Sequence, residues 1–415
     1  MHYIFFKLQT LPFSHLLLQY ARLILKFLLT AILTVFVLFL TSTITEENEG
    51  TVAEIHVSSR LSKIFDTVGH SEKYCVVYNY WQADGKYTEN HITLVLHSTV
   101  EYLNFLEDQL KTWQGGISIA LLIPNPSIQP DLNNTTVISL LETSSILEIK
   151  KSNQVSLHLF FEKQNYSNCP MINIPIYLNY QSYGIKDLQK FGKVTELYPI
   201  NTARNIARKG IKTELFISGD IEQFYVTNFE PRMYKLAEKV LLELLLLLLF
   251  REKKQTVLIH RRFEIREDVQ VPKNKQELLI LLQNHRAFKF HQLYNGIAHV
   301  IPNLRSWLKT EENTKESQIT EVLSYQNSKW EPQFVGDSRV PFHDEQFPYR
   351  YRTNQQLGQH FVDVFSIHRG VVKGSMPKYR QFAKMVSKLK PYPIRSRFLS
   401  ELSKKYPGMK KKCFA

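Results

Sequence analysis

The sequence predicts an α/β fold, with a mixed and mostly parallel sheet that has helices on both faces. A strand-like run at Ile92–Ser98 is followed by helical spacing over Thr99–Trp113 and by a second apolar run at Ile117–Pro124. A run that is apolar at every position is typical of a strand buried on both faces, as in a parallel sheet. Because strand, helix and strand at this spacing form a βαβ unit, we expect a parallel sheet covered by helices.

The same alternation continues along the chain. Strands are predicted where apolar residues form short runs, and helices where they recur every three to four residues. The apolar run Leu241–Phe250 is too short to cross a membrane and contains Glu243, so we expect a buried helix there. The other predicted strands are Cys75–Trp81, Val155–Phe161, Glu214–Glu222 and Thr256–Ile265, and the other predicted helices are Thr202–Lys209 and Lys273–His285.

Length and composition narrow the class of protein. The chain has 415 residues, enough for one large domain or two ordinary ones. With 44% hydrophobic and 22% charged residues, it has the composition of a folded protein. Three cysteines without C-x-x-C spacing exclude a disulfide scaffold and a zinc ribbon. The formal net charge is +14, but the cations are scattered apart from the C-terminal tail, so we expect no nucleic-acid partner.

The N-terminal region predicts a membrane anchor. Phe27–Ile44 is an uncharged apolar run of 18 residues, with basic residues before it and acidic residues after it. The positive-inside rule then predicts a cytosolic segment 1–26, a signal anchor 27–44, a stem 45–73 and a lumenal domain 74–413. The alternative is a cleaved signal peptide, which would start nearer the N-terminus and end in a small-residue cleavage site.

A lumenal location makes two further features meaningful. N-glycosylation triplets begin at Asn133, Asn134 and Asn165, and we expect them in exposed loops. In an oxidising compartment Cys75 can pair with Cys169 or with Cys413. Three buried free thiols are an equally good interpretation, and the sequence leaves these alternatives open.

An acid-x-acid triplet is the first candidate for chemistry. Asp220 and Glu222 follow an apolar run, and side chains at i and i+2 at a strand end point the same way. Carboxylate oxygens are the ligands that Mn²⁺ or Mg²⁺ prefers. By itself the triplet is more often a solvated turn, but a buried strand leading into it favours a metal site.

Other candidate residues lie before and after this triplet. In the predicted helix within Tyr198–Gly210, Arg204 and Arg208 are four residues apart and share a face, with Asn201 and Asn205 beside it. Such a helix could hold a diphosphate, and a basic surface helix is the alternative. The stretch Trp330–Phe347 combines aromatic rings with carboxylates, which suits carbohydrate binding. Asp344 or Glu345 could remove a proton from an acceptor hydroxyl, and His368 could supply a further metal ligand.

Taken together, these motifs resemble one glycosyltransferase family. The residues that carry the resemblance are YPINTARNIARKG, the acid-x-acid triplet, WEP, VPFHDEQF, IHRG and the tail ending in YPGMKKKC, in this order from about Tyr74 to Cys413. The family contains β-1,4-glucuronyltransferases, formerly named N-acetyllactosaminide β-1,3-N-acetylglucosaminyltransferases, and the glucuronyltransferase domain of the enzyme that extends the dystroglycan glycan. The resemblance implies a GT-A fold, a single-pass type II Golgi membrane enzyme, and inverting transfer from a UDP-sugar with Mn²⁺ (or Mg²⁺) as cofactor.

The resemblance also assigns functions to single residues. It makes Asp220, Glu222 and His368 the metal ligands, and it places Ile92–Leu103 along the uridine. It puts Asp344 or Glu345 at the acceptor side, and we expect Asp344 to be the base. The residues expected to bind substrates are Arg204, Asn205, Asn201, His97, Ser98 and Trp330.

The donor, the acceptor and the activity remain expectations. We expect glucuronic acid to be transferred in a β-1,4 linkage to a glycoprotein glycan, as in O-mannosyl glycan synthesis, in a complex with other Golgi glycosyltransferases. A β-1,3-N-acetylglucosaminyltransferase of the poly-N-acetyllactosamine type is the alternative. A glucuronate donor needs a nearby cation, for which His260, Arg261 and Arg262 are available, although an exposed basic strand edge is an equally good interpretation.

Two departures from the family pattern bear on activity. Glu222 stands where the relatives carry a second aspartate, and its longer side chain can still bind a metal. The segment between Phe347 and His368 is shorter than in the relatives. An inactive glycan-binding relative is therefore a further hypothesis.

Overall fold

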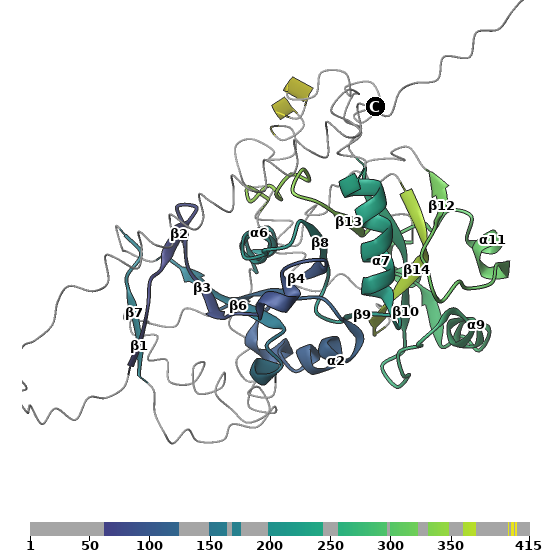
Figure 1. The fold of residues 1–415 in the computed structure, drawn as a ribbon, viewed down its shortest axis with the longest axis horizontal. Helices are drawn as coiled ribbons and strands as arrows, with labels where there is room; N and C mark the ends of the chain where they lie inside the picture. Colours follow the sequence, from purple (N-terminus) through teal and green to yellow (C-terminus); the bar gives the residue numbers. More distant parts are fainter. Residues whose placement is uncertain are drawn as a thin grey trace, which may run out of the picture. The chain divides into compact units, whose positions relative to one another are not determined.

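The computed structural model describes most of the chain after its first 61 residues (Figure 1). The described residues are 62–123, 149–163, 168–175, 198–243, 256–296, 299–322, 331–347, 360–370 and positions 397, 400, 401, 403 and 404. Met1–Ser59 and Arg60–Ala415 cluster as two separate units, and all described residues belong to the second.

Several predicted features lie outside the described residues. They are the membrane anchor 27–44, the glycosylation triplets at Asn133, Asn134 and Asn165, the substrate-binding Trp330, and most of the shortened segment between Phe347 and His368. Within the described part of the chain, every helix is too short or too polar to cross a membrane.

One large mixed sheet organises the described unit. Its strands run in the order β12-β14-β10-β13-β8-β4-β5-β6-β3-β2, with β11 paired to β10 and β9 paired to β14 (Figure 1). The strands are β2 (Val68–His70), β3 (Tyr74–Trp81), β4 (Ile92–Ser98), β5 (Ile117–Leu122), β6 (Val155–Glu162), β8 (Leu215–Ser218), β9 (Gln223–Tyr225), β10 (Leu258–Ile265), β11 (Ala287–Lys289), β12 (Ile319–Val322), β13 (Phe334–Gly336) and β14 (His360–Arg369). A separate two-stranded sheet pairs β1 (Ser62–Phe65) with β7 (Ile172–Pro175).

The centre of the sheet is parallel, as the βαβ pattern predicts. Strands β8, β4, β5 and β6 run parallel to one another, and β10 runs parallel to β14. The other pairs among the described strands are antiparallel. The expectation of a mostly parallel sheet is therefore wrong for the sheet as a whole, because the short strands β9, β11, β12 and β13 and the edge strands β2 and β3 pair antiparallel with their neighbours.

Helices cover both faces of the parallel strands, because side chains of a strand alternate between faces. On one face, Val95 of β4 packs with Ala203 and Ile206 of α6. On the other face, Leu94 of β4 joins the larger core with Leu106 of α2. The helices are α2 (Phe105–Thr112), α6 (Ile200–Lys209), α7 (Phe229–Ala237), α9 (Lys275–Gln283), α10 (Gln292–Asn295) and α11 (Leu304–Lys309), with 3₁₀ turns η1 (Gly85–Tyr87) and η2 (Val100–Tyr102).

The apolar run after α7 begins as a buried helix. α7 continues into a π-helical turn, η4 (Glu238–Glu243), in which Leu241 is buried against the core. This agrees with the buried helix expected from Leu241, as far as Glu243. The remainder of the run lies outside the described residues.

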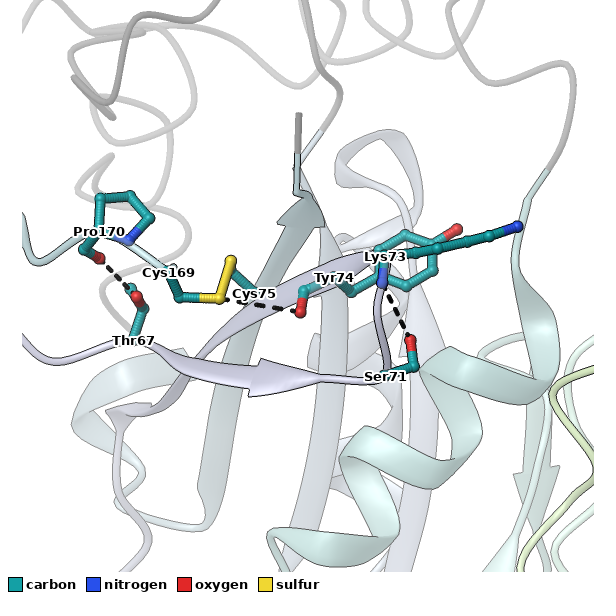
Figure 2. Close-up of a disulfide and its surroundings, with 7 residues drawn as sticks. All are labelled: Thr67, Ser71, Lys73, Tyr74, Cys75, Cys169 and Pro170. Carbon is teal, nitrogen blue, oxygen red and sulfur yellow. Dashed lines mark hydrogen bonds between the residues drawn. A yellow bond between two sulfur atoms is a disulfide. The ribbon is translucent and has the colours of Figure 1, made fainter. Parts of the chain in front are cut away.

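A disulfide joins β3 to the segment that leads into β7 (Figure 2). Cys75 of β3 is bonded to Cys169, 94 residues further along the chain. The hydroxyl of Thr67 donates a hydrogen bond to the carbonyl of Pro170 beside this link. Of the three interpretations that the sequence left open, the structure therefore has the Cys75–Cys169 pair.

We predict that Cys75→Ser lowers the free energy of unfolding by about 2–4 kcal/mol, because the unfolded chain then loses a cross-link that closes a long loop. Chemical denaturation of the purified protein measures this change. Cys413→Ser is the matched control and should leave stability unchanged. Equal destabilisation by both substitutions would contradict the observed pairing.

A buried histidine ties α6 to the sheet. His158 of β6 is fully buried, and its Nδ1 accepts a hydrogen bond from the Asn79 amide at 3.0 Å. Its Nε2 therefore carries the proton and donates to Ser118 Oγ at 3.0 Å, and Ser118 donates in turn to the carbonyl of Ala207 in α6 at 2.6 Å. A side chain at Gly210 would collide with the imidazole, so α6 ends there on a glycine. Burial lowers the pKa of His158 from 6.5 to about 3.

This lowered pKa makes folding sensitive to acid. Between about pH 6.5 and pH 3 the unfolded chain binds a proton at this residue and the folded chain does not. We therefore expect the neutral, buried His158 to lower the free energy of unfolding by about 1.4 kcal/mol for each unit fall in pH within this window. Urea unfolding at several pH values measures the slope, and His158→Gln should reduce it. Substitution of the exposed His285 is the control, and the same loss of slope there would refute the assignment.

Candidate functional site

The two acids of the acid-x-acid triplet lie in a turn between two strands. β8 ends at Ser218 and β9 begins at Gln223, so Asp220 and Glu222 follow the strand instead of lying at its end as predicted. Their orientation is therefore set by the turn and not by strand alternation. β9 pairs with β14, and the amide of Arg369 donates to the carbonyl of Glu222 at 3.1 Å. This pairing brings the turn next to His368.

A buried glutamine fixes the backbone of this turn. Gln109 of α2 is fully buried, and its amide nitrogen donates to the carbonyls of Ile221 (2.8 Å) and Gln223 (2.6 Å), on both sides of Glu222. A buried carbonyl without a hydrogen-bond donor lowers the stability of the fold. Gln109 of α2 therefore stabilises the observed path of the backbone from Ile221 to Gln223. Sequence reasoning missed Gln109, although a glutamine on the apolar face of a predicted helix was a signal that could have found it.

We predict that Gln109→Leu destabilises the protein by about 2–4 kcal/mol, because two buried carbonyls lose their donor. Hydrogen exchange should show faster exchange of the Gln223 and Arg369 amides, which belong to the turn and its partner strand. Lys111→Gln, on the exposed side of the same helix, is the control and should cost less than about 0.5 kcal/mol. An unchanged turn in Gln109→Leu would show that the carbonyls find other donors.

A second group of buried polar side chains lies beneath the turn. The Gln223 amide nitrogen donates to Gln333 Oε1 and, at 2.6 Å, to Ser366 Oγ. Gln333 donates to the carbonyl of Ser218 at the end of β8 (2.6 Å), and His260 Nε2 lies 2.9 Å from Ser366 Oγ. Gln333 directly follows the WEP motif. Its hydrogen bonds and those of Gln223 and Ser366 connect β8, β9, β10 and β14 next to the acid turn.

Asp220 is the electrostatic centre of the site. Its carboxylate lies 3.3 Å from the guanidinium of Arg262 on β10 and 3.7 Å from that of Arg204 on α6. Burial disfavours the charged form, but Arg262, Arg204, His97 and His368 outweigh it and hold the pKa of Asp220 well below its usual range. With 34% of its side chain exposed, the ionised carboxylate is still accessible to a ligand.

One ring nitrogen of His368 is engaged by the backbone. Its Nδ1 lies 3.2 Å from the carbonyl of Gly370, to which it can donate, and this leaves Nε2 for another partner. Phe290 packs against the imidazole with ring centroids 5.3 Å apart. Gly370 has a φ of +95°, a conformation that favours glycine, so the G of IHRG is required for the chain to leave β14 here.

The three predicted metal ligands approach one another along the backbone. Gln223 pairs with His368 in the β9–β14 ladder, and His368 is within electrostatic reach of Asp220. Across the described residues, however, no three His, Cys, Asp or Glu side chains are grouped as a metal site would be. The assignment of Asp220, Glu222 and His368 to a metal stays a prediction.

The polar face of α6 holds a loop, the segment Val340–Phe347. Asn205 accepts from the His343 amide (2.9 Å) and donates to the His343 carbonyl (2.8 Å). Arg208 donates to the carbonyls of Pro341 and Val340, and its guanidinium lies between the rings of Phe216 and Phe342. The substrate-binding function predicted for Asn205 stays a prediction, but in the structure its amide has protein partners.

The two candidate bases on this loop have different surroundings. Glu345 accepts hydrogen bonds from His70 (2.7 Å), Asn205 (2.7 Å) and Thr202 (3.1 Å). Burial opposes its ionisation, but these donors outweigh burial and lower the pKa of Glu345. Burial raises the pKa of Asp344, whose side chain accepts only from the Gln346 amide among the hydrogen bonds between described residues.

Asn201 and the end of β4 complete the site. Asn201 donates to the backbone carbonyl of Asp344 at 2.8 Å, so it fixes the position of this residue. His97 Nδ1 lies 3.1 Å from the hydroxyl of Tyr198, and the two rings pack 5.4 Å apart. Ser98 is buried beside them and donates to the Thr99 carbonyl. His97 and Ser98 thus lie at the carboxyl end of β4, where ligands bind in open α/β sheets.

The basic run on β10 is buried, so an exposed basic strand edge is wrong. His260 bonds to Ser366 below the site, and Arg261 points to the other face, where its guanidinium lies 5.0 Å from the Trp307 ring. Arg262 reaches Asp220. Because side chains alternate along a strand, Arg261 faces away from the acid turn, and His260, on the same side as Arg262, is bonded to Ser366 instead.

The fold and the site define the class of protein. A large mixed α/β sheet fits a GT-A-like fold, and an acidic turn with cations beyond the parallel strands fits a glycosyltransferase. Residues 91–407 match the family described as glycosyl-transferase for dystroglycan, and the chain belongs to this family. It is therefore a glycosyltransferase.

Named relatives agree with this class. The chain is 21% identical to beta-1,4-glucuronyltransferase 1 of Danio rerio and 24% identical to that of Bos taurus. These matches cover 78% of this chain and 76% and 78% of the relatives. It is also 26% identical to the human xylosyl- and glucuronyltransferase LARGE1 over 58% of this chain and 25% of that protein.

Proposed function

We propose that the protein transfers glucuronic acid from UDP-glucuronic acid to a glycoprotein glycan, forming a β-1,4 linkage with inversion, as in O-mannosyl glycan synthesis. The observation that carries the proposal is the convergence of Asp220, Arg204 and Arg262 at the end of the parallel strands, in a chain whose matched relatives are named glucuronyltransferases. This arrangement supports a donor with a negatively charged diphosphate.

The donor side has residues that suit Mn²⁺. Asp220 is held ionised, and His368 has its Nδ1 tied to a backbone carbonyl, so a carboxylate oxygen and Nε2 would be the donor atoms. Glu222 precedes Gln223, the strand partner of His368, and would supply a third ligand. A bound Mn²⁺ would offset the charge that develops on the leaving diphosphate.

The acceptor side favours Asp344 as the base. Inversion in one step needs a carboxylate on the face opposite the leaving group, with a pKa near the operating pH. The pKa of Asp344 is raised, and Asn201 holds its backbone in place. Glu345 is already engaged by three donors, so we assign it the function of holding the Val340–Phe347 loop against α6.

The cellular setting is part of the proposal. We propose a single-pass type II protein of the Golgi membrane, anchored by Phe27–Ile44, with the catalytic domain in the lumen and other Golgi glycosyltransferases as partners. The asymmetric charges around this apolar run support the orientation. A Cys75–Cys169 disulfide is compatible with an oxidising lumen.

A donor screen on the purified lumenal portion tests the reaction. With Mn²⁺ and a xylose-ended acceptor, we expect transfer from UDP-glucuronic acid and little from UDP-N-acetylglucosamine. Asp344→Asn should lower kcat by about 10²–10⁴-fold, because the base is lost while the fold is kept. Glu345→Gln is the matched comparison. It should lower the free energy of unfolding, and it should lower kcat less than Asp344→Asn does. Asp220→Ala should abolish Mn²⁺-dependent transfer without unfolding the protein.

Each alternative has its own outcome. Transfer of N-acetylglucosamine instead of glucuronic acid would support the β-1,3-N-acetylglucosaminyltransferase. Donor binding without transfer or hydrolysis, in a folded protein, would support an inactive glycan-binding relative. A larger fall in kcat for Glu345→Gln than for Asp344→Asn would reverse the assignment of the base.

A further inference from the structure

Arg262 is a largely buried cation whose position the family assignment does not explain. It lies on β10, and its side chain is only 13% exposed. Its guanidinium contacts Asp220 at 3.3 Å and packs 3.7 Å above the ring of Phe290. The ring contact fixes the plane of the guanidinium, which limits the directions from which a ligand can approach it.

Arg262 has unused hydrogen-bonding capacity. Its Nε is buried and has no acceptor among the described residues. A guanidinium carries five N–H donors, and the ion pair with Asp220 uses one nitrogen. Among the described residues, the carboxylate of Glu331 also acts on it through its charge.

Arg262 also lies next to the proposed donor site. Phe290, which covers the guanidinium, packs against His368 at 5.3 Å and against His299 at 4.8 Å. Asp220, its ion-pair partner, is the acid that we propose to hold Mn²⁺. Arg262 contacts one oxygen of Asp220, Oδ2, and a guanidinium fork that uses one nitrogen in this way can pair with a second anion beside it.

We propose that Arg262 recognises the carboxylate of the sugar in a UDP-uronic acid and so determines donor specificity, an inference that rests on the proposed function. The planar fork of a guanidinium matches a carboxylate in a bidentate pair. The donor diphosphate has its own proposed partners in Mn²⁺ and Arg204. A neutral hexose or N-acetylhexosamine has no carboxylate to pair with Arg262.

The matched ligands UDP-glucuronic acid and UDP-glucose test this inference, because they differ only in the carboxylate at C6. Titration calorimetry with Mn²⁺ measures their affinities for the catalytically competent lumenal portion, together with that of UDP. We expect the wild-type protein to bind UDP-glucuronic acid about 10- to 100-fold more tightly than UDP-glucose. In Arg262→Gln the preference for UDP-glucuronic acid over UDP-glucose should be lost, so that the two affinities become equal.

Two further variants separate this function from a structural one. Arg262→Lys keeps the charge without the fork, so it should retain part of the preference, and it replaces Arg262→Gln if that variant does not fold. Arg261→Lys, on the opposite face of the same strand, is the control and should keep the full preference. Thermal unfolding of each variant without ligand checks that the fold is intact.

The outcomes distinguish the two proposals. If Arg262→Gln weakens UDP, UDP-glucose and UDP-glucuronic acid equally, Arg262 acts through the diphosphate or Asp220 and the inference is wrong. If Arg262→Gln keeps the wild-type preference, the inference alone is wrong. If the wild-type protein shows no preference for UDP-glucuronic acid and transfers another sugar, the proposed function is wrong, and the inference that rests on it is wrong as well.

Discussion

The path of the chain between β8 and β9 is the constraint on which the site depends. β8 belongs to the parallel centre of the sheet, whereas β9 pairs with β14 beside His368. The connection between them must therefore cross from one part of the sheet to another with its carbonyls buried. Gln109 supplies donors to two of these carbonyls, and Gln333 supplies one to the end of β8. Without these amides, Asp220 would have no defined position relative to the cations around it.

The family motifs contain both residues proposed to bind substrates and residues whose hydrogen bonds stabilise the site. In YPINTARNIARKG, Arg204 turns towards Asp220, while Asn205 and Arg208 hold the loop that carries Asp344. In that loop, Glu345 is engaged by His70, Thr202 and Asn205, and Asp344 keeps its side chain largely available. Motifs that are distant in the sequence thus form one site, because the side chains of one motif make hydrogen bonds with the residues of another.

The predictable part of the fold is the part governed by local periodicity. The runs at Ile92–Ser98 and Ile117–Pro124 form parallel strands β4 and β5 with α2 between them, because a run that is apolar at most positions is buried on both faces of a sheet. The antiparallel pairs of β9, β11 and β13 were missed. Strands of three residues carry too little periodicity to be recognised, and their pairing depends on which neighbours are free.

By itself the sequence determined the α/β class, the order of the main elements, the family motifs and the presence of acids after an apolar run. The tertiary structure decided what those residues do. It placed His260 and Arg261 away from the acid turn and Arg262 against it, and it paired Cys75 with Cys169. The physical reason is that apolar periodicity is a property of residues that are neighbours in the sequence. Ion pairs, hydrogen bonds and a disulfide depend on which distant segments the sheet order brings together.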